Sequence, residues 1–191
     1  MSVKTKHILS SNEYFHVYNR GVERKEIFFS ERNYQYFVRR MTDSLNLTEI
    51  EIVAYCLMPN HFHLLLYQKE PERISKFMRE VCDGYAKAIN KERSRSGHLF
   101  EGKYKIKQID SNEYLLHLSR YIHLNPVRAK LVLYPQDWEF SSCGEYFGVR
   151  ESNIISTRVI VTQVGNAEGY RKFVEEYLPR QKEKISRFLF S

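Results

Sequence analysis

The sequence predicts an α+β fold: a ferredoxin-like, split βαβ antiparallel sheet with two helices on one face and an added, tyrosine-bearing helix against the other. Two observations lead to this prediction. Hydrophobic spacing switches between strand and helix periods in the order strand, helix, strand, strand, helix, strand. A Met-Pro-Asn connection at residues 58–60 is short enough to join the second and third strands directly. In this topology the first and third strands lie in the middle of the sheet.

The first half of the chain supplies a strand, a helix and a pair of strands. Residues 14–19 read as a strand that ends at Gly21, and Ser30 suits the N-cap position of the helix that follows. Residues 49–57 and 61–67 read as the two strands of the pair. The helix that follows Ser30 has an apolar stripe at helical spacing, formed by Tyr34, Phe37, Val38, Met41 and Leu45.

The second half supplies a helix, a strand and the added helix. The helix is followed by a polar stretch at residues 91–97 and then by a strand at residues 104–110. Either Asp110 or Ser111 can cap the added helix. The buried stripe of the first of these helices is Ile74, Phe77, Met78, Val81, Tyr85 and Ala88, and that of the added helix is Leu115, Leu118 and Ile122.

The added helix presents a second, more polar stripe. Side chains spaced by 100° place four residues together on it: Tyr114, His117, Tyr121 and Asn125. Pro126 disfavours helical geometry in the residue before it, so we expect Asn125 to lie at the end of the helix. Tyr121 and Asn125 then present a phenol and an amide oxygen one turn apart. His123 falls on roughly the opposite side and is not expected in the same site.

Two histidines lie one residue apart in an apolar, strand-like run. Because side chains alternate across a strand, His61 and His63 point to one side while Phe62, Leu64 and Leu66 point to the other. Two imidazoles on one face can hold one divalent metal ion. The alternative without a functional role is a pair of polar strand residues that face solvent.

Composition limits the class of protein. The 191 residues suit one domain, or one domain with an appendage, and Lys plus Arg exceed Asp plus Glu by 30 to 23, for a net charge of +7. That excess favours a nucleic-acid partner, although many soluble proteins are mildly basic. The three cysteines have no paired or metal-like spacing, which favours a reducing cytoplasm. No signal peptide or membrane-length apolar run is expected.

Several motifs together resemble a known family. Residues 58–63 read MPNHFH, and residues 119–129 read SRYIHLNPVRA. Shorter matches are YNRG at 18–21, LFEGKY at 99–104, and the pairs 137–138 and 141–142. On these motifs the sequence resembles the single-tyrosine HUH transposases, and among them the REP-associated tyrosine transposases, which are transposase-like proteins of the small insertion-sequence type. The likeness runs from about residue 14 to 142 and fades beyond it.

The resemblance implies a metal-dependent, site-specific endonuclease and strand transferase for single-stranded DNA. It places Tyr121 as the nucleophile, with a 5′-phosphotyrosine intermediate near a repeat hairpin. It places His61 and His63 as metal ligands and Asn125 as a third. Mg²⁺ or Mn²⁺ is the expected ion, because a divalent cation polarises the phosphodiester and leaves positions open for phosphate oxygens. A phenol suits reversible attack because its pKa of about 10 lies well below that of a sugar hydroxyl.

Alternatives remain open for each role. Tyr114 is the rival nucleophile, and His117 is a substitute for Asn125, which could serve only to end the helix. The general base could be His117, His16 or water. A domesticated, largely non-catalytic protein that binds DNA hairpins is the alternative function, and a metal-binding regulatory protein is a more distant one.

Contacts to DNA are predicted mainly from basic side chains. Three lysines alternate along the fourth strand and would place their ammonium groups on one face, where they could follow a phosphate backbone. The same pattern could simply solvate an edge strand. Arg20 is a candidate from the turn shared with the family. The full set is Arg20, Arg93, Arg95, Lys103, Lys105, Lys107, Arg128 and Lys130.

The chain is divided into a nuclease domain, residues 1–142, and an extension, residues 143–191. The extension is expected to contain an amphipathic helix at about 167–177 and a basic, aromatic end, and its role is left open. Trp138 is expected to anchor the tail to the domain. Both a monomer and a homodimer are compatible with the sequence, so the active site could form within one chain or between two.

Overall fold

The structure is a computed structural model that describes residues 10–178. The basic, aromatic end expected near the C-terminus therefore lies outside the described residues. The elements are β1 (Glu13–Arg20), η1 (Val22–Arg24), α1 (Glu31–Thr48), β2 (Ile50–Met58), β3 (His61–Gln68), α2 (Arg73–Glu92), β4 (Lys105–Ile109), α3 (Asn112–Arg128), η2 (Pro135–Asp137), α4 (Cys143–Tyr146), α5 (Arg158–Val161), η3 (Thr162–Val164) and α6 (Ala167–Glu175).

The four strands form one antiparallel sheet in the order β2-β3-β1-β4. This is the predicted ferredoxin-like arrangement, with β1 and β3 in the middle. The turn between β2 and β3 contains only Pro59 and Asn60, and its tightness fixes their register, with Met58 opposite His61. The histidine pair therefore lies on a central strand, as predicted.

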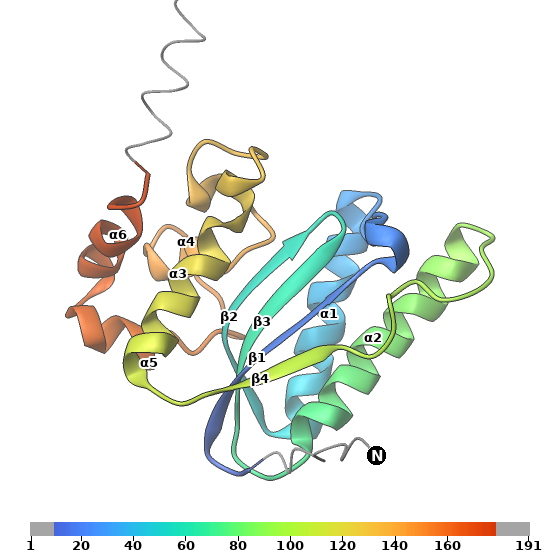
Figure 1. Ribbon diagram of the computed structural model, residues 1–191, viewed down its shortest axis with the longest axis horizontal. Coiled ribbons are helices and arrows are strands. Elements are labelled where there is room, and N and C mark those ends of the chain that lie inside the picture. Colours follow the sequence, from blue (N-terminus) through green and yellow to red (C-terminus); the bar gives the residue numbers. More distant parts are fainter. Residues whose placement is uncertain (1–9, 179–191) are drawn as a thin grey trace, which may run out of the picture.

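Each face of the sheet is covered by different helices, so the sheet is the middle layer of three (Figure 1). On one face, Phe62 and Leu64 pack in an apolar cluster with Phe37 of α1 and Phe77 of α2. These two helical residues and two strand residues are among those that the hydrophobic periodicity assigns to the buried side. On the other face, Ile122 of α3 belongs to a second cluster. The two-sided burial confirms the predicted positions of the paired helices and of the added helix.

Residues 138–178 hold α3 against the sheet and cover the open edge of β2. Trp138 donates its indole N–H to the Leu57 carbonyl at 2.9 Å, which confirms it as an anchor. Backbone hydrogen bonds continue along the same edge of β2: Phe140 accepts from Leu57, and Ser142 and Ser156 donate to β2 carbonyls. Without them this edge would expose unpaired peptide groups. Tyr146 and Tyr170 are fully buried in the same apolar cluster as α3. Within residues 10–178, no helix combines the length and apolar character needed to cross a membrane.

Arg120 fastens α3 to α6. Its guanidinium lies between two aromatic rings, 3.9 Å from the ring centre of Phe173 and 3.7 Å from that of Tyr177. It also donates to the Phe173 carbonyl at 3.0 Å, and its side chain is only 5% exposed. Cation–π contacts gain strength when they are shielded from water. The residue immediately before Tyr121 is therefore firmly anchored.

The predicted end of the added helix is wrong. We expected it at Asn125, whereas α3 continues through Pro126 to Arg128. Proline has no N–H, so Pro126 leaves the Ile122 carbonyl without its helical donor. The Asn125 side chain compensates, because its Nδ2 donates to the Tyr121 carbonyl at 2.8 Å and to the Ile122 carbonyl at 3.4 Å. The start was predicted correctly: Ser111 caps the helix and accepts the Tyr114 N–H at 3.2 Å.

Candidate active site and nucleic-acid interface

The register of the sheet gathers polar side chains beside the histidine pair. Tyr18 of β1 lies directly opposite His63 of β3, and Lys105 of β4 lies directly opposite Tyr18. Directly opposed residues of antiparallel strands point to the same face. The three side chains therefore form a row across the face that α3 partly covers. His16 is displaced from Tyr18 by two residues along β1 and shares this face.

Both histidines make hydrogen bonds through the same ring nitrogen. His61 Nδ1 lies 2.6 Å from Oδ1 of Asn60, which can only accept, so His61 is protonated at Nδ1. His63 Nδ1 lies 2.9 Å from Nε2 of His16. No hydrogen bond engages either Nε2 atom of the pair within residues 10–178. Two imidazole nitrogens of the type that bind metal are thus left without a partner.

Burial keeps these imidazoles uncharged near neutral pH. Desolvation, followed by the neighbouring charges of His16 and His61, lowers the pKa of His63 to about 3. Desolvation, followed by the charge of Lys107, lowers the pKa of His16 to about 4. Burial also lowers the pKa of His61. A protonated imidazole cannot bind a cation, so the folded chain keeps the pair in the form needed for metal binding.

Tyr121 projects from α3 over the histidine pair. Its ring centre lies 5.5 Å from that of His63, and the two rings meet edge to face at 78°. The side chain is 39% exposed, and no hydrogen bond engages its hydroxyl within the described chain. The guanidinium of Arg128, two turns later, lies 5.1 Å from the centre of the phenol ring. A solvent-accessible phenol, an imidazole pair and a cation are therefore brought together within one chain.

The other polar residues of α3 are placed differently. His117 accepts a hydrogen bond from Arg120 at 2.7 Å, and its ring packs edge-on against Phe173, so it is engaged with α6. Tyr114 lies under the ammonium group of Lys107, at 4.6 Å. Asn125 uses its Nδ2 within the helix, and no hydrogen bond engages its Oδ1 in the described chain.

The nitrogen and oxygen donors expected from the sequence are of types that bind divalent cations. Within residues 10–178, no group of three or more His, Cys, Asp or Glu side chains is arranged to hold a metal ion. The ligands expected from the sequence are the two imidazoles, whose ring centres lie 5.1 Å apart, and the amide oxygen of Asn125. A shell with so few protein ligands leaves positions for phosphate oxygens, as metal-assisted phosphodiester chemistry requires.

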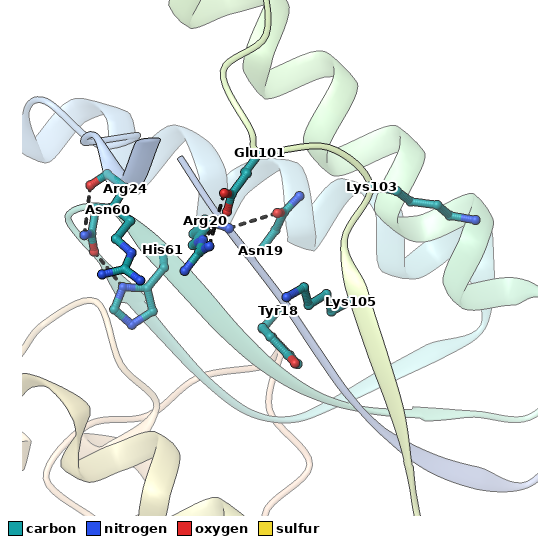
Figure 2. Close-up of a pocket in the computed structure, with 9 residues that line it drawn as sticks. All are labelled: Tyr18, Asn19, Arg20, Arg24, Asn60, His61, Glu101, Lys103 and Lys105. Atoms are coloured by element: carbon teal, nitrogen blue, oxygen red, sulfur yellow. Dashed lines mark hydrogen bonds and ion pairs between the residues drawn. The ribbon is translucent and has the colours of Figure 1, made fainter. Parts of the chain in front are cut away.

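A basic cavity adjoins the histidine pair. Its volume is about 320 Å³, and its wall includes four cationic side chains and one carboxylate (Figure 2). The carboxylate of Glu101 is bound by Arg20, which donates from Nη2 at 3.1 Å and also from Nε. The lining residues are Tyr18, Asn19, Arg20, Arg24, Asn60, His61, Glu101, Lys103 and Lys105.

The predicted DNA-contacting residues are only partly gathered there. Arg20, Lys103 and Lys105 line the cavity. Lys107 follows on the same face of β4, since it lies opposite His16. Arg128 lies beside Tyr121. The remaining three are elsewhere in the sequence and structure: Arg93 stacks on Phe29 at 4.1 Å, Arg95 follows α2, and Lys130 follows α3.

Three residues of this region were missed or left undefined by the sequence analysis. Tyr18 was quoted only as part of a motif, yet its ring centre lies 5.8 Å from that of His63. His16 was considered only as a base, and Arg24 was not considered. The signal for the first two is the strand alternation of β1 combined with the antiparallel register, which would have placed them beside His63.

Comparisons with known proteins agree with the fold. Residues 10–125 match the sequence model of a family described as "Transposase IS200 like". A solved structure of the REP-associated tyrosine transposase bound to a REP hairpin is similar, with a TM-score of 0.64 and 18% identity, over 82% of this chain and 98% of that one. A candidate transposase from Deinococcus radiodurans R1 has a TM-score of 0.44 and 17% identity, over 64% and 95% of the two chains. No curated protein matches the sequence.

Proposed function

The chain belongs to the IS200-like transposase family, and from this premise we propose that it is a metal-dependent endonuclease and strand transferase for single-stranded DNA, with Tyr121 as its nucleophile. The observation that carries the proposal is the position of the Tyr121 phenol beside the imidazole of His63 in the same chain. The enzyme would cut DNA next to a repeat hairpin and rejoin it without an external source of energy.

The chemistry follows from the phenol. Tyr121 Oη loses its proton to water and attacks the phosphorus as the bond from phosphorus to O3′ breaks. The departing O3′ takes a proton from water, which leaves the DNA with a free 3′-hydroxyl and a 5′-phosphate on the tyrosine. Because the phosphotyrosine bond retains the energy of the phosphodiester bond that was broken, an incoming 3′-hydroxyl can displace the tyrosine and reverse the step. Of the three candidate bases, His117 is engaged with Arg120 and His16 with His63, so water is the proton acceptor that this geometry favours.

A divalent cation, when bound, supplies Lewis-acid polarisation of the scissile phosphate. His61 and His63 would hold it through their Nε2 atoms, and Asn125 through Oδ1. The amide oxygen of Asn125 and the substrate phosphate are hard ligands, which suit Mg²⁺ or Mn²⁺. The protein residues would also orient the phosphate, since Arg128 places a second positive charge beside the phenol.

We propose that the DNA strand runs along the histidine face and into the basic cavity. The cations that line it and Lys107 further along β4 supply positive charge next to the histidine pair. Phosphate contacts of this kind supply affinity without reading sequence. The similar solved transposase is bound to a REP hairpin, and a hairpin with a single-stranded flank is the substrate class that we propose for this chain.

The test is incubation with hairpin oligonucleotides that carry single-stranded flanks, followed by a denaturing gel and mass analysis of the tyrosine-linked peptide. We expect a covalent adduct with Mn²⁺ and none with EDTA. Hairpin binding that survives chelation, without cleavage by the native protein under any metal condition, would instead establish the non-catalytic binder.

Asn125 can be tested separately for its two roles. Asn125→Ala removes both the donor and the acceptor, whereas Asn125→Asp keeps an oxygen ligand and replaces the N–H donor with a second oxygen and a negative charge. Both variants should lose about 1 kcal/mol of unfolding free energy, because the Tyr121 carbonyl loses its side-chain donor. Only Asn125→Ala should weaken Mn²⁺ binding, by about 10-fold, as measured by calorimetry. Unchanged Mn²⁺ affinity in Asn125→Ala would leave the residue with a helical role alone.

A further inference from the structure

His16 of β1 and His63 of β3 are joined by one buried hydrogen bond on the face of the sheet. His16 Nε2 and His63 Nδ1 are 2.9 Å apart, on neighbouring central strands. The side chains are 8% and 7% exposed, and the two rings stack at an interplanar angle of 26°. Both imidazoles are almost fully excluded from water, so solvent competes little for this hydrogen bond. The bond is therefore a fixed element of the site.

The position of the proton in this bond decides which nitrogen of His63 is available. A neutral imidazole carries one proton, on either Nδ1 or Nε2. If His63 is protonated at Nδ1, it donates to His16, and its Nε2 keeps a lone pair. If His16 is the donor instead, the proton of His63 lies on Nε2, and that atom cannot bind a cation. His63 Nδ1 is engaged in either case, so Nε2 is the only ligand atom that His63 offers.

We propose that His16 is a positioning residue: it accepts the Nδ1 proton of His63 and thereby holds His63 in the tautomer that presents Nε2 to a divalent cation. This inference rests on the proposed metal site. The other imidazole is held in the same way, because Asn60 Oδ1 accepts from His61 Nδ1 at 2.6 Å. Each ligand thus has its own acceptor behind it, one from β1 and one from the β2–β3 turn. Outer-shell acceptors of this kind fix the orientation and basicity of metal-bound imidazoles.

Two substitutions separate acceptance of the proton from simple filling of space. His16→Phe keeps a planar ring but has no acceptor. His16→Gln restores an acceptor oxygen at about the distance of Nε2 from the backbone. We expect Mn²⁺ to bind about 10- to 100-fold more weakly in His16→Phe and within a few-fold of the native protein in His16→Gln, by calorimetry without DNA. Tyr14→Phe, on the same strand and face, is the matched control and should bind Mn²⁺ normally.

The tautomer itself is visible by NMR of the metal-free protein labelled with ¹⁵N-histidine. We expect His63, assigned from the spectrum of His63→Gln, to be protonated at Nδ1 in the native protein and in His16→Gln. In His16→Phe the proton should move wholly or partly to Nε2. This readout responds to proton position and not to general loss of stability.

The outcomes are distinct. His63 protonated at Nε2 in the native protein, or unchanged Mn²⁺ affinity in His16→Phe, overturns the proposal. If His16→Phe does not fold, the NMR tautomer of His63 in the native protein and the Mn²⁺ affinity of His16→Gln still test the proposal. Because both measurements omit DNA, Mn²⁺ binding that depends on His16 in a protein that never cleaves DNA would defeat the proposed function and leave this inference standing.

Discussion

Tyr121→Phe is expected to abolish the covalent adduct with single-stranded DNA and to lower cleavage by at least about 1000-fold. The substitution removes one oxygen atom, and that oxygen is the proposed nucleophile. No hydrogen bond engages it within residues 10–178, so its loss leaves the packing of α3 unchanged. The measurement is single-turnover cleavage of a labelled hairpin oligonucleotide in Mn²⁺, with adduct quantified on a denaturing gel.

Two other tyrosines serve as matched controls for this result. Tyr18→Phe removes the second phenol close to His63, and Tyr114→Phe removes the rival on the same stripe of α3. Both variants should still form the adduct, and mass analysis should locate the DNA on Tyr121. An adduct that persists in Tyr121→Phe and disappears in Tyr18→Phe would transfer the nucleophilic role to β1.

Removal of the histidine pair should have the second largest effect. In His61→Ala and in His63→Ala, each change deletes one of the two nitrogen ligands, so Mn²⁺ affinity should fall at least about 100-fold and cleavage should fall with it. Hairpin affinity in EDTA should stay near the native value, because the cations of the cavity and of β4 are retained. The measurements are calorimetry with Mn²⁺ and fluorescence anisotropy with a labelled hairpin.

His98→Ala controls for the loss of a histidine as such, since His98 is exposed in the loop after α2. It should match the native protein in both measurements. His63 is buried, so the unfolding free energy of His63→Ala must be measured in parallel. Native Mn²⁺ affinity in a folded His63→Ala variant would contradict the metal site.

The topology could be predicted because the spacing of apolar residues and the residues at the ends of each element are local features of the sequence. Ser30 marks the start of α1, and the two-residue turn before His61 leaves only one way to pair β2 with β3. The histidine pair then had to lie on a central strand. Short-range features of this kind can be recognised in a single sequence.

The site could be predicted less completely because its geometry depends on contacts between distant segments. Pro126 reads as a helix end, and only the side chain of Asn125 shows why the helix continues. His117 shares a stripe with Tyr121, but Arg120 and Phe173 draw it toward α6. Strand spacing gives the face on which His16 lies, whereas the identity of its partner requires the register.

The anchoring of Arg120 between two rings of the C-terminal region has a consequence for how DNA ends could be exchanged. The neighbouring phenol projects from a helix that is fastened on both sides, so a 5′ end attached to it would stay where it was cut. Exchange of partners would then depend on the departing 3′ end diffusing away and a different one arriving. The tyrosine would keep its position in the protein during strand exchange, and only the DNA ends would move.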